Sequence, residues 1–243
     1  MTFRLSPSAV NTYFYCPMKF KLQYLDKIRP PTKAKCLVDG IMLHSYYELF
    51  YKGMPEEVTK DYLDFYYNRL PEEVKKNYKE DIHNFLEFNK RVFDSSEKKF
   101  LKPLATEQKI FDEELNFVGI IDCVLTDGKN ILVLDFKTGK PKTKIPDDYE
   151  FQLVSYIHLW NLRNPDLPAT HVGLLYTKGK IGEHNPLTKD VTSLDSSVLF
   201  KRINEVNDNI DKGNFPRTED SYKCRYCDVA MHCLGGMLND FSK

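Results

Sequence analysis

The sequence predicts a mixed α/β fold, and three observations support this prediction. Residues 55–100 are rich in charge and place aromatic residues at roughly helical spacing. Strand-like runs follow Pro103, and Asp127-Gly128 between two of them is a strong hairpin signal. Helix-like segments then alternate with a further strand-like run, which is the pattern of a sheet flanked by helices.

The first half of the chain carries clear signals for helix starts and stops. Ser6 before Pro7 is typical of an N-cap followed by proline at the first helical position. The Cys-Pro step at 16–17 should break this helix, because proline lacks a backbone N–H. The pattern of residues 39–52 is also helical. We therefore expect an N-terminal helix, followed by a helical region at about 39–100.

The second half is expected to form the sheet, at about 104–185, within one domain that spans residues 1–243. Its apolar runs are short and bounded by turn residues, which is typical of strands. A last segment, at about 214–243, contains three of the six cysteines. The expected strands are 107–111, 115–126, 130–137 and 171–177, and the expected helices are 147–163 and 196–213.

The composition excludes several classes of protein. Basic and acidic residues both number 35, so the net charge is zero, and the bulk basic charge of many nucleic-acid-binding proteins is missing. No apolar run reaches the roughly 18 residues of a membrane-spanning helix, and the N-terminus lacks an apolar signal region. We expect a cytoplasmic protein without membrane contact, in which clustered cysteines hold metal rather than form disulfides.

The hairpin is expected to place two carboxylates and an ammonium on one face of the sheet. With a turn at 128–129, Asp122 lies opposite Asp135, and Lys137 projects from the same face two residues later. With a turn at 127–128, Asp122 and Asp135 still share a face. Only a three-residue loop would separate them.

Burying these three charges in an apolar strand is costly, and a divalent cation would offset the cost. Mg²⁺ and Mn²⁺ prefer carboxylate oxygens and water, and they polarise phosphates and lower the pKa of a bound water. Lys137 would then orient the water or stabilise the charge of the transition state. The simpler alternative is a structural salt bridge at the end of a strand.

Other polar residues are candidates for the same site. Gln152 and Tyr156 lie four residues apart, hence on one face of the expected helix. His44 in an early helix would be a suitable third metal ligand, although a lone histidine is more often structural. Glu107 begins the first strand, where it either adds a carboxylate or is simply solvated.

Four short motifs, each weak alone, occur here in an order that resembles the RecB-like branch of the PD-(D/E)XK nucleases. The motifs are G-x3-H at 40–44, G-x2-D at 119–122, D-x-K at 135–137 and Q-x3-Y at 152–156. The resemblance implies a restriction-endonuclease-like mixed sheet flanked by helices. It also implies Mg²⁺- or Mn²⁺-dependent hydrolysis of phosphodiester bonds in DNA.

The resemblance further assigns roles to individual residues. In this family the lysine of D-x-K assists hydrolysis, and the helix that carries the glutamine and tyrosine of Q-x3-Y flanks the site. Glu107 is a possible outer partner of the ligands. The implied metal ligands are His44, Asp122, Asp135 and the backbone carbonyl of Phe136, and the implied catalytic residues are Asp122, Asp135, Lys137, Gln152 and Tyr156.

The last segment contains Cys224, Cys227 and Cys233 with the spacing C-x2-C-x5-C. Three thiolates are one fewer than structural zinc or a cubane iron–sulfur cluster normally takes. A subset of RecB-like nucleases, including the bacterial AddB nuclease domain and the CRISPR-associated nucleases of the fourth Cas family, carries a [4Fe–4S] cluster with this layout. The resemblance to this subset implies Cys16 as the fourth ligand.

Such a cluster would join the first helix to the C-terminal segment and add its binding free energy to folding. Spacing cannot choose the metal, so zinc remains an alternative, and Cys224, Cys227 and His232 begin like a zinc knuckle. Cys36 is an alternative fourth ligand. Cys123 is expected to be a buried, inert thiol.

The resemblance implies DNA as the partner, single-stranded or with single-stranded ends, and a role as an exonuclease in CRISPR adaptation with integrase proteins. A homo-oligomer is possible. Two alternatives stay open: a recombination or repair nuclease of a virus or mobile element, and a non-catalytic iron–sulfur adaptor that binds DNA. Candidate phosphate contacts follow the last strand of the hairpin, at Lys140, Lys142 and Lys144.

Overall fold

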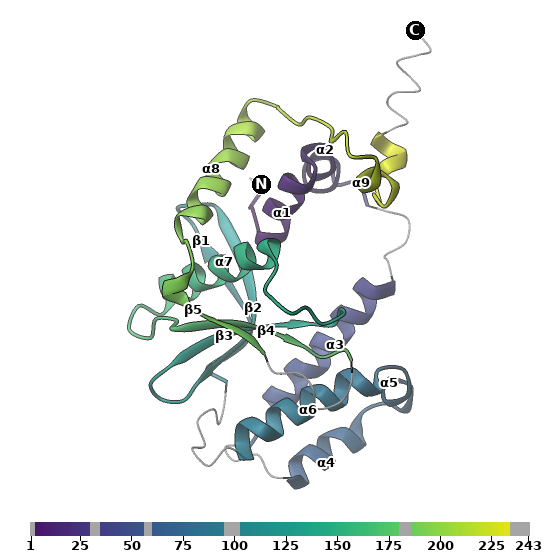
Figure 1. Cartoon of the computed structure of the whole chain (residues 1–243), viewed down its shortest axis with the longest axis vertical. Helices are drawn as coiled ribbons and strands as arrows, with labels where there is room; N and C mark the ends of the chain where they lie inside the picture. The colour runs from purple at the N-terminus through teal and green to yellow at the C-terminus, as the bar shows by residue number, and fades with distance from the viewer. Residues whose placement is uncertain (1–2, 30–34, 56–59, 95–102, 180–185, 234–243) are drawn as a thin grey trace. The chain divides into compact units, whose positions relative to one another are not determined.

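Figure 1 shows the chain as a computed structural model, which divides into two compact units. The first unit consists of Met1–Lys33, Phe111–Val118 and Ser196–Lys243, and the second of Ala34–Ile110 and Gly119–Asp195. Our expectation of one domain over residues 1–243 stays a prediction. The structure describes residues 3–29, 35–55, 60–94, 103–179 and 186–233.

The described strands form a five-stranded sheet in the order β1-β2-β3-β4-β5, which confirms the predicted mixed α/β fold. β2 pairs antiparallel with β3, β3 parallel with β4, and β4 antiparallel with β5. The helix α7 makes the crossover that the parallel pair requires. The strands are β1 (Ala105–Asp112), β2 (Phe117–Thr126), β3 (Ile131–Lys137), β4 (His171–Tyr176) and β5 (Leu187–Asp190), followed by the short helix η2 (Val191–Ser193).

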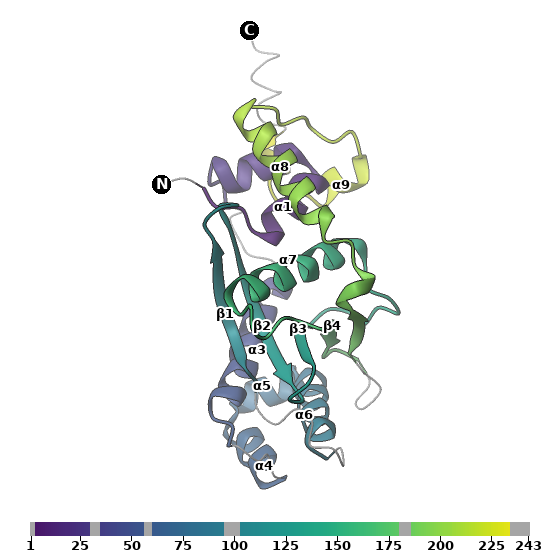
Figure 2. The same ribbon diagram turned by 90° about the vertical axis from the view of Figure 1, so that its left-hand side faces the viewer.

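Helices cover both faces of the sheet in the second unit (Figures 1 and 2). α7 packs on β3 and β4, whereas α3 and α6 pack on the opposite face. That second layer is aromatic: the rings of Tyr47 and Phe85 stack with centroids 4.2 Å apart, and Phe136 of β3 packs against both. These helices are α3 (Lys35–Lys52), α4 (Lys60–Arg69), α5 (Glu72–Asn77), α6 (Lys79–Asp94) and α7 (Asp147–Arg163).

The β2–β3 hairpin adopts the first of the two expected registers. Cys123 pairs with Leu134 and Thr126 with Ile131, so the turn residues are 128 and 129. The Asp127 carboxylate accepts a hydrogen bond from the backbone N–H of Lys129 at 2.9 Å, which closes the turn. Gly128 at φ +85° adopts a left-handed conformation that costs glycine little.

The first unit joins the N-terminal helices to the C-terminal segment. The Ser6 hydroxyl caps α1 by accepting from the Ala9 N–H at 3.3 Å, and α1 ends before Cys16, as predicted. Asp228 accepts from Lys19 at 2.9 Å and from Gln23 at 2.8 Å. The helices of this unit are α1 (Pro7–Tyr15), α2 (Pro17–Phe20), η1 (Lys21–Leu25), α8 (Ser197–Asp211) and α9 (Ser221–Arg225).

The short strand β5 lies at the edge of the sheet, next to β4. β5 was not expected from the sequence, because its residues alternate between half-buried and exposed without an apolar run. In the described ranges, no helix has the length and apolar character needed to cross a membrane.

Gly119 of β2 lets α7 lie close to the sheet. A Cβ at this position would lie 2.6 Å from Leu159 Cδ1 and 3.3 Å from Tyr156 Cε1. We therefore expect Gly119→Ala to lower the free energy of unfolding, measured by urea denaturation, by about 1–3 kcal/mol through overpacking. Gly139→Ala is the matched control, because nothing lies within 4 Å of its Cβ, and its effect should stay within about 0.5 kcal/mol. Equal effects of the two substitutions would contradict this account.

Candidate functional site

The candidate site lies in the second unit, beyond the last paired residues of β2 and β3. The paired register runs from Thr126 to Cys123, and at the next residue the Asp122 side chain bonds to β3. Asp122 Oδ2 accepts a hydrogen bond of 2.7 Å from the backbone N–H of Phe136. A carboxylate thus occupies a position where a backbone carbonyl would continue the ladder, and Asp122 is held buried.

His44 on α3 faces this carboxylate. Its Nε2 lies 3.1 Å from the carbonyl oxygen of Phe136, which can only accept, so Nε2 carries a proton. Nδ1 lies 3.6 Å from Asp122 Oδ2 and equally far from Glu107 Oε1. Burial lowers the pKa of His44, but hydrogen bonds to Asp122 and Glu107 and the charges of Asp122 and Asp135 outweigh it and raise the pKa to about 10.

Glu107 is closer to the centre of the site than its sequence position indicates. One ligand atom each from His44, Glu107 and Asp122 lie within 4.8 Å of one another, a spacing that suits a bound cation. Glu107 has φ +45°, in the left-handed region, which costs a non-glycine residue about 1–3 kcal/mol and is frequent at functional sites. The sequence placed Glu107 in an outer position, whereas the structure groups it with two expected ligands.

Asp135, which is buried, and Lys137, which is half-buried, form an ion pair on the side of the site that faces α7. Lys137 Nζ lies 2.6 Å from Asp135 Oδ2 and donates to Gln152 Oε1 at 2.9 Å. Gln152 Nε2 in turn donates to the Tyr156 hydroxyl at 2.7 Å. The motifs D-x-K and Q-x3-Y therefore meet in one hydrogen-bonded chain.

Burial and neighbouring charges perturb the pKa values of this pair. Burial, together with the charge of Asp122, raises the pKa of Asp135 to about 6 against the opposing effect of Lys137. Burial lowers the pKa of Lys137, but the charge of Asp135 outweighs it and leaves the pKa above its usual value. Lys137 therefore stays protonated, and the raised pKa of the Asp135 carboxyl lies closer to neutral pH than its usual value.

Tyr149 was not identified from the sequence as part of the site. The ammonium of Lys137 lies over its ring, 4.2 Å from the centroid. Tyr149 stands three residues before Gln152 in the first turn of α7, so the helical spacing could have indicated it.

The glycine of G-x3-H has a steric function. A Cβ on Gly40 would lie 3.3 Å from the Thr138 hydroxyl, just beyond β3. Gly40 therefore allows α3 to approach the end of β3 one turn before His44, which brings His44 within reach of Phe136.

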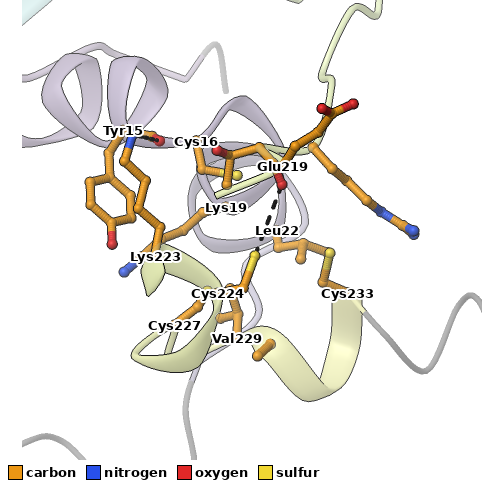
Figure 3. A pocket seen from close by; sticks show the side chains of 13 residues that line it. Tyr15, Cys16, Lys19, Leu22, Glu219, Lys223, Cys224, Cys227, Val229 and Cys233 are labelled. Carbon is orange, nitrogen blue, oxygen red and sulfur yellow. Dashed lines mark hydrogen bonds between the residues drawn. The ribbon is translucent and has the colours of Figure 1, made fainter. Parts of the chain in front are cut away.

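The expected cysteine ligands all line one pocket of about 430 Å³ within the first unit (Figure 3). Cys16 is buried and directly precedes α2. Cys224 lies in α9, and Cys227 and Cys233 follow that helix. All four are free thiols. Cys224 Sγ lies 3.9 Å from the Thr218 carbonyl, the contact dashed in Figure 3. Apolar walls come from Leu22, Val229 and Ala230, and basic side chains from Lys19, Arg217 and Lys223.

The remaining candidates lie elsewhere. Cys123 is fully buried beneath α3, and burial raises the pKa of its thiol, as expected for an inert cysteine. His232 is exposed and does not line the cysteine pocket. The side chain of Cys36 lies outside the described residues. Lys140, Lys142 and Lys144 are exposed on the loop after β3, and their contact with phosphate stays a prediction.

The chain is similar to known proteins over most of its length. Residues 4–234 match the PD-(D/E)XK nuclease superfamily, and the chain belongs to this superfamily. The chain is 25% identical to the Gene 69 protein of Mycobacterium phage L5 and 26% identical to that of Mycobacterium phage D29. Each alignment covers 94% of this chain and 95% of the phage protein.

A crystal structure of a candidate exonuclease from Eubacterium rectale is also similar to this chain. The TM-score is 0.49 at 14% identity, and the superposition covers 94% of this chain and 87% of that one.

The raised pKa of His44 makes the stability of the metal-free protein depend on pH. The folded-state pKa of about 10 exceeds the unfolded value of 6.5, so protonated His44 stabilises the fold fully below pH 6.5, and this contribution is lost as the pH rises through 10. Between about pH 7 and about pH 9.5 in EDTA, we expect the free energy of urea unfolding to fall more in wild type than in His44→Gln. If the free energy of unfolding falls equally with pH in the two proteins, the pKa of His44 is not raised.

Proposed function

We propose that the chain is a metal-dependent DNA nuclease, an exonuclease that hydrolyses phosphodiester bonds in single-stranded DNA or at single-stranded ends. The observation that carries this proposal is the set of His44, Glu107 and Asp122, with ligand atoms within 4.8 Å of one another. It lies beside the aspartate–lysine pair. Membership of the PD-(D/E)XK nuclease superfamily supports the proposal.

The donor set of the site fits Mg²⁺ or Mn²⁺. Carboxylate oxygens suit both ions, and Mn²⁺ also accepts imidazole nitrogen. His44 would bind through Nδ1, because Nε2 donates to the Phe136 carbonyl. When bound, such an ion polarises the phosphate and lowers the pKa of its water. Asp135 is the further ligand that we propose. The Phe136 carbonyl, which the family resemblance implied as a ligand, accepts from Nε2 on the side of the imidazole ring away from Nδ1, so it does not face the same ion.

Lys137 would serve the reaction as a preoriented cation. Asp135, Gln152 and the ring of Tyr149 fix its ammonium before any substrate is bound. An ammonium held in this way donates to a phosphate oxygen and stabilises the charge of the transition state, with little reorganisation. Gln152 and Tyr156 act through Lys137 and are therefore positioning residues.

We also propose that Cys16, Cys224, Cys227 and Cys233 hold a [4Fe–4S] cluster. The support is that all four line one pocket, in which three basic side chains outnumber one acidic side chain, Glu219, as suits an anionic cluster. Ligation would join the start of α2 to the C-terminal segment. Since the four thiols lie together only in the folded chain, the binding free energy would add to folding.

Two pathways are candidates for this nuclease. The expected role in CRISPR adaptation, with integrase partners, rests on the sequence motifs and the cysteine layout. The relatives in two mycobacteriophages favour the second candidate, a recombination or repair nuclease of a virus or mobile element. Integrase genes and a repeat array beside the gene would favour the first pathway, and phage recombination genes the second. A homo-oligomer stays a prediction.

The central experiment is cleavage of end-labelled single-stranded DNA with Mn²⁺ or Mg²⁺. We expect Asp135→Asn to reduce kcat by about 10²–10³-fold, because it removes a buried charge that orients Lys137 and that we propose as a metal ligand. Asp64→Asn, an exposed aspartate on α4, is the matched control and should cut like wild type. A folded wild type that is silent with both metals would favour the non-catalytic adaptor, and equal cutting by Asp135→Asn would exclude this site.

A second experiment tests the cluster by its content of iron and acid-labile sulfide. Anaerobically purified wild type should contain both, whereas Cys227→Ser should lose them and unfold at lower urea concentration, as ligation contributes to folding. Cys123→Ala, which changes a buried cysteine outside the pocket, should keep its iron. If wild type contains zinc in place of iron, the four cysteines form a zinc site and the proposed cluster is wrong. If Cys227→Ser keeps its iron, Cys227 is not a ligand.

A further inference from the structure

A pocket of about 450 Å³ opens directly from the candidate metal site. His44 and Glu107 of the candidate metal site line it, and Thr138 contributes from the loop after β3. The rest of the wall is one stripe of α3, from Leu37 to Glu48. The volume lies in the range of about 300–1,000 Å³ that is usual for small-molecule pockets, which suits one nucleotide rather than a duplex.

Two residues of this wall are apolar and exposed. Leu37 and Ile41 lie four residues apart on α3, hence on one face, and His44 continues that face three residues later. The side chains of Leu37 and Ile41 remain 54% and 53% exposed although they line the pocket. We call these two residues the α3 ridge.

We propose that this pocket holds an unpaired nucleobase next to the phosphate that is cleaved, with the α3 ridge packed against the face of the base. This inference rests on the proposed nuclease function and names the part of the substrate that the site grips. Every base has an apolar face, so the contact tolerates any sequence. In a duplex these faces are stacked on neighbouring bases, so only an unpaired nucleotide can enter.

The charges of the pocket fix the orientation of the nucleotide. No lysine or arginine is among the described residues that line the pocket, and Glu48 there pairs with Lys52 at 2.6 Å, so the α3 wall offers a phosphate little attraction. Lys137 lies on the other side of the site, against α7, where its ammonium attracts the phosphate. The neutral base is therefore the part of the nucleotide that suits the α3 ridge.

The experiment combines a protein variant with a substrate variant. The double substitution Leu37→Ser and Ile41→Ser removes the ridge, and an abasic nucleotide at the cleaved end of single-stranded DNA removes the base. On normal single-stranded DNA we expect the double variant to raise KM about tenfold, since loss of apolar burial of this size weakens binding by about that factor. On the abasic substrate, wild type and double variant should have equal KM values.

Leu49→Ala is the matched control, because Leu49 is 55% exposed on the same helix but does not line the pocket. It should leave KM unchanged on both substrates. The inference is overturned if the double variant binds normal DNA like wild type, or if its loss is as large on abasic DNA. Wild type that cuts neither substrate would reject the proposed nuclease function itself, whereas the outcomes above leave that function standing.

Discussion

The arrangement of the site depends on the carboxylate of Asp122. Its hydrogen bond to the Phe136 N–H replaces a ladder bond where the pairing of β2 and β3 stops. One oxygen thus satisfies a buried backbone donor and also faces His44 Nδ1. The neighbouring Phe136 carbonyl fixes the other nitrogen of His44. The end of a hairpin therefore sets the position of His44, which comes from a helix, and keeps a proton on its Nε2.

The hairpin could be predicted from the sequence because a two-residue turn fixes every later pairing. A turn at either Asp127-Gly128 or residues 128–129 puts Asp122 and Asp135 on one face, and the observed register is that of the turn at 128–129. The contact between D-x-K and Q-x3-Y was also accessible, because helical spacing puts Gln152 and Tyr156 on one face. These are local rules, and they act within single elements or between adjacent ones.

The features that the sequence did not reveal depend on tertiary context. Glu107 joins His44 and Asp122 through a backbone conformation at φ +45° that no residue pattern announces. β5 is short, half-buried and without apolar alternation, so only its pairing with β4 defines it. Gly40 and Gly119 were read as parts of motifs, whereas their role is steric: each keeps a helix close to a strand that carries an acidic residue of the site.

The two cations of the site, the imidazolium of His44 and the ammonium of Lys137, are held by different residues, and this difference fits the proposed chemistry. His44 Nδ1 faces Asp122 and Glu107, whose oxygens are among the proposed metal ligands, so a bound metal would displace the proton on this nitrogen. The Lys137 ammonium is held by Asp135, Gln152 and Tyr149, and two of these three do not belong to the proposed ligand set. We infer that one positive charge is exchanged for the metal while the other remains in place beside it.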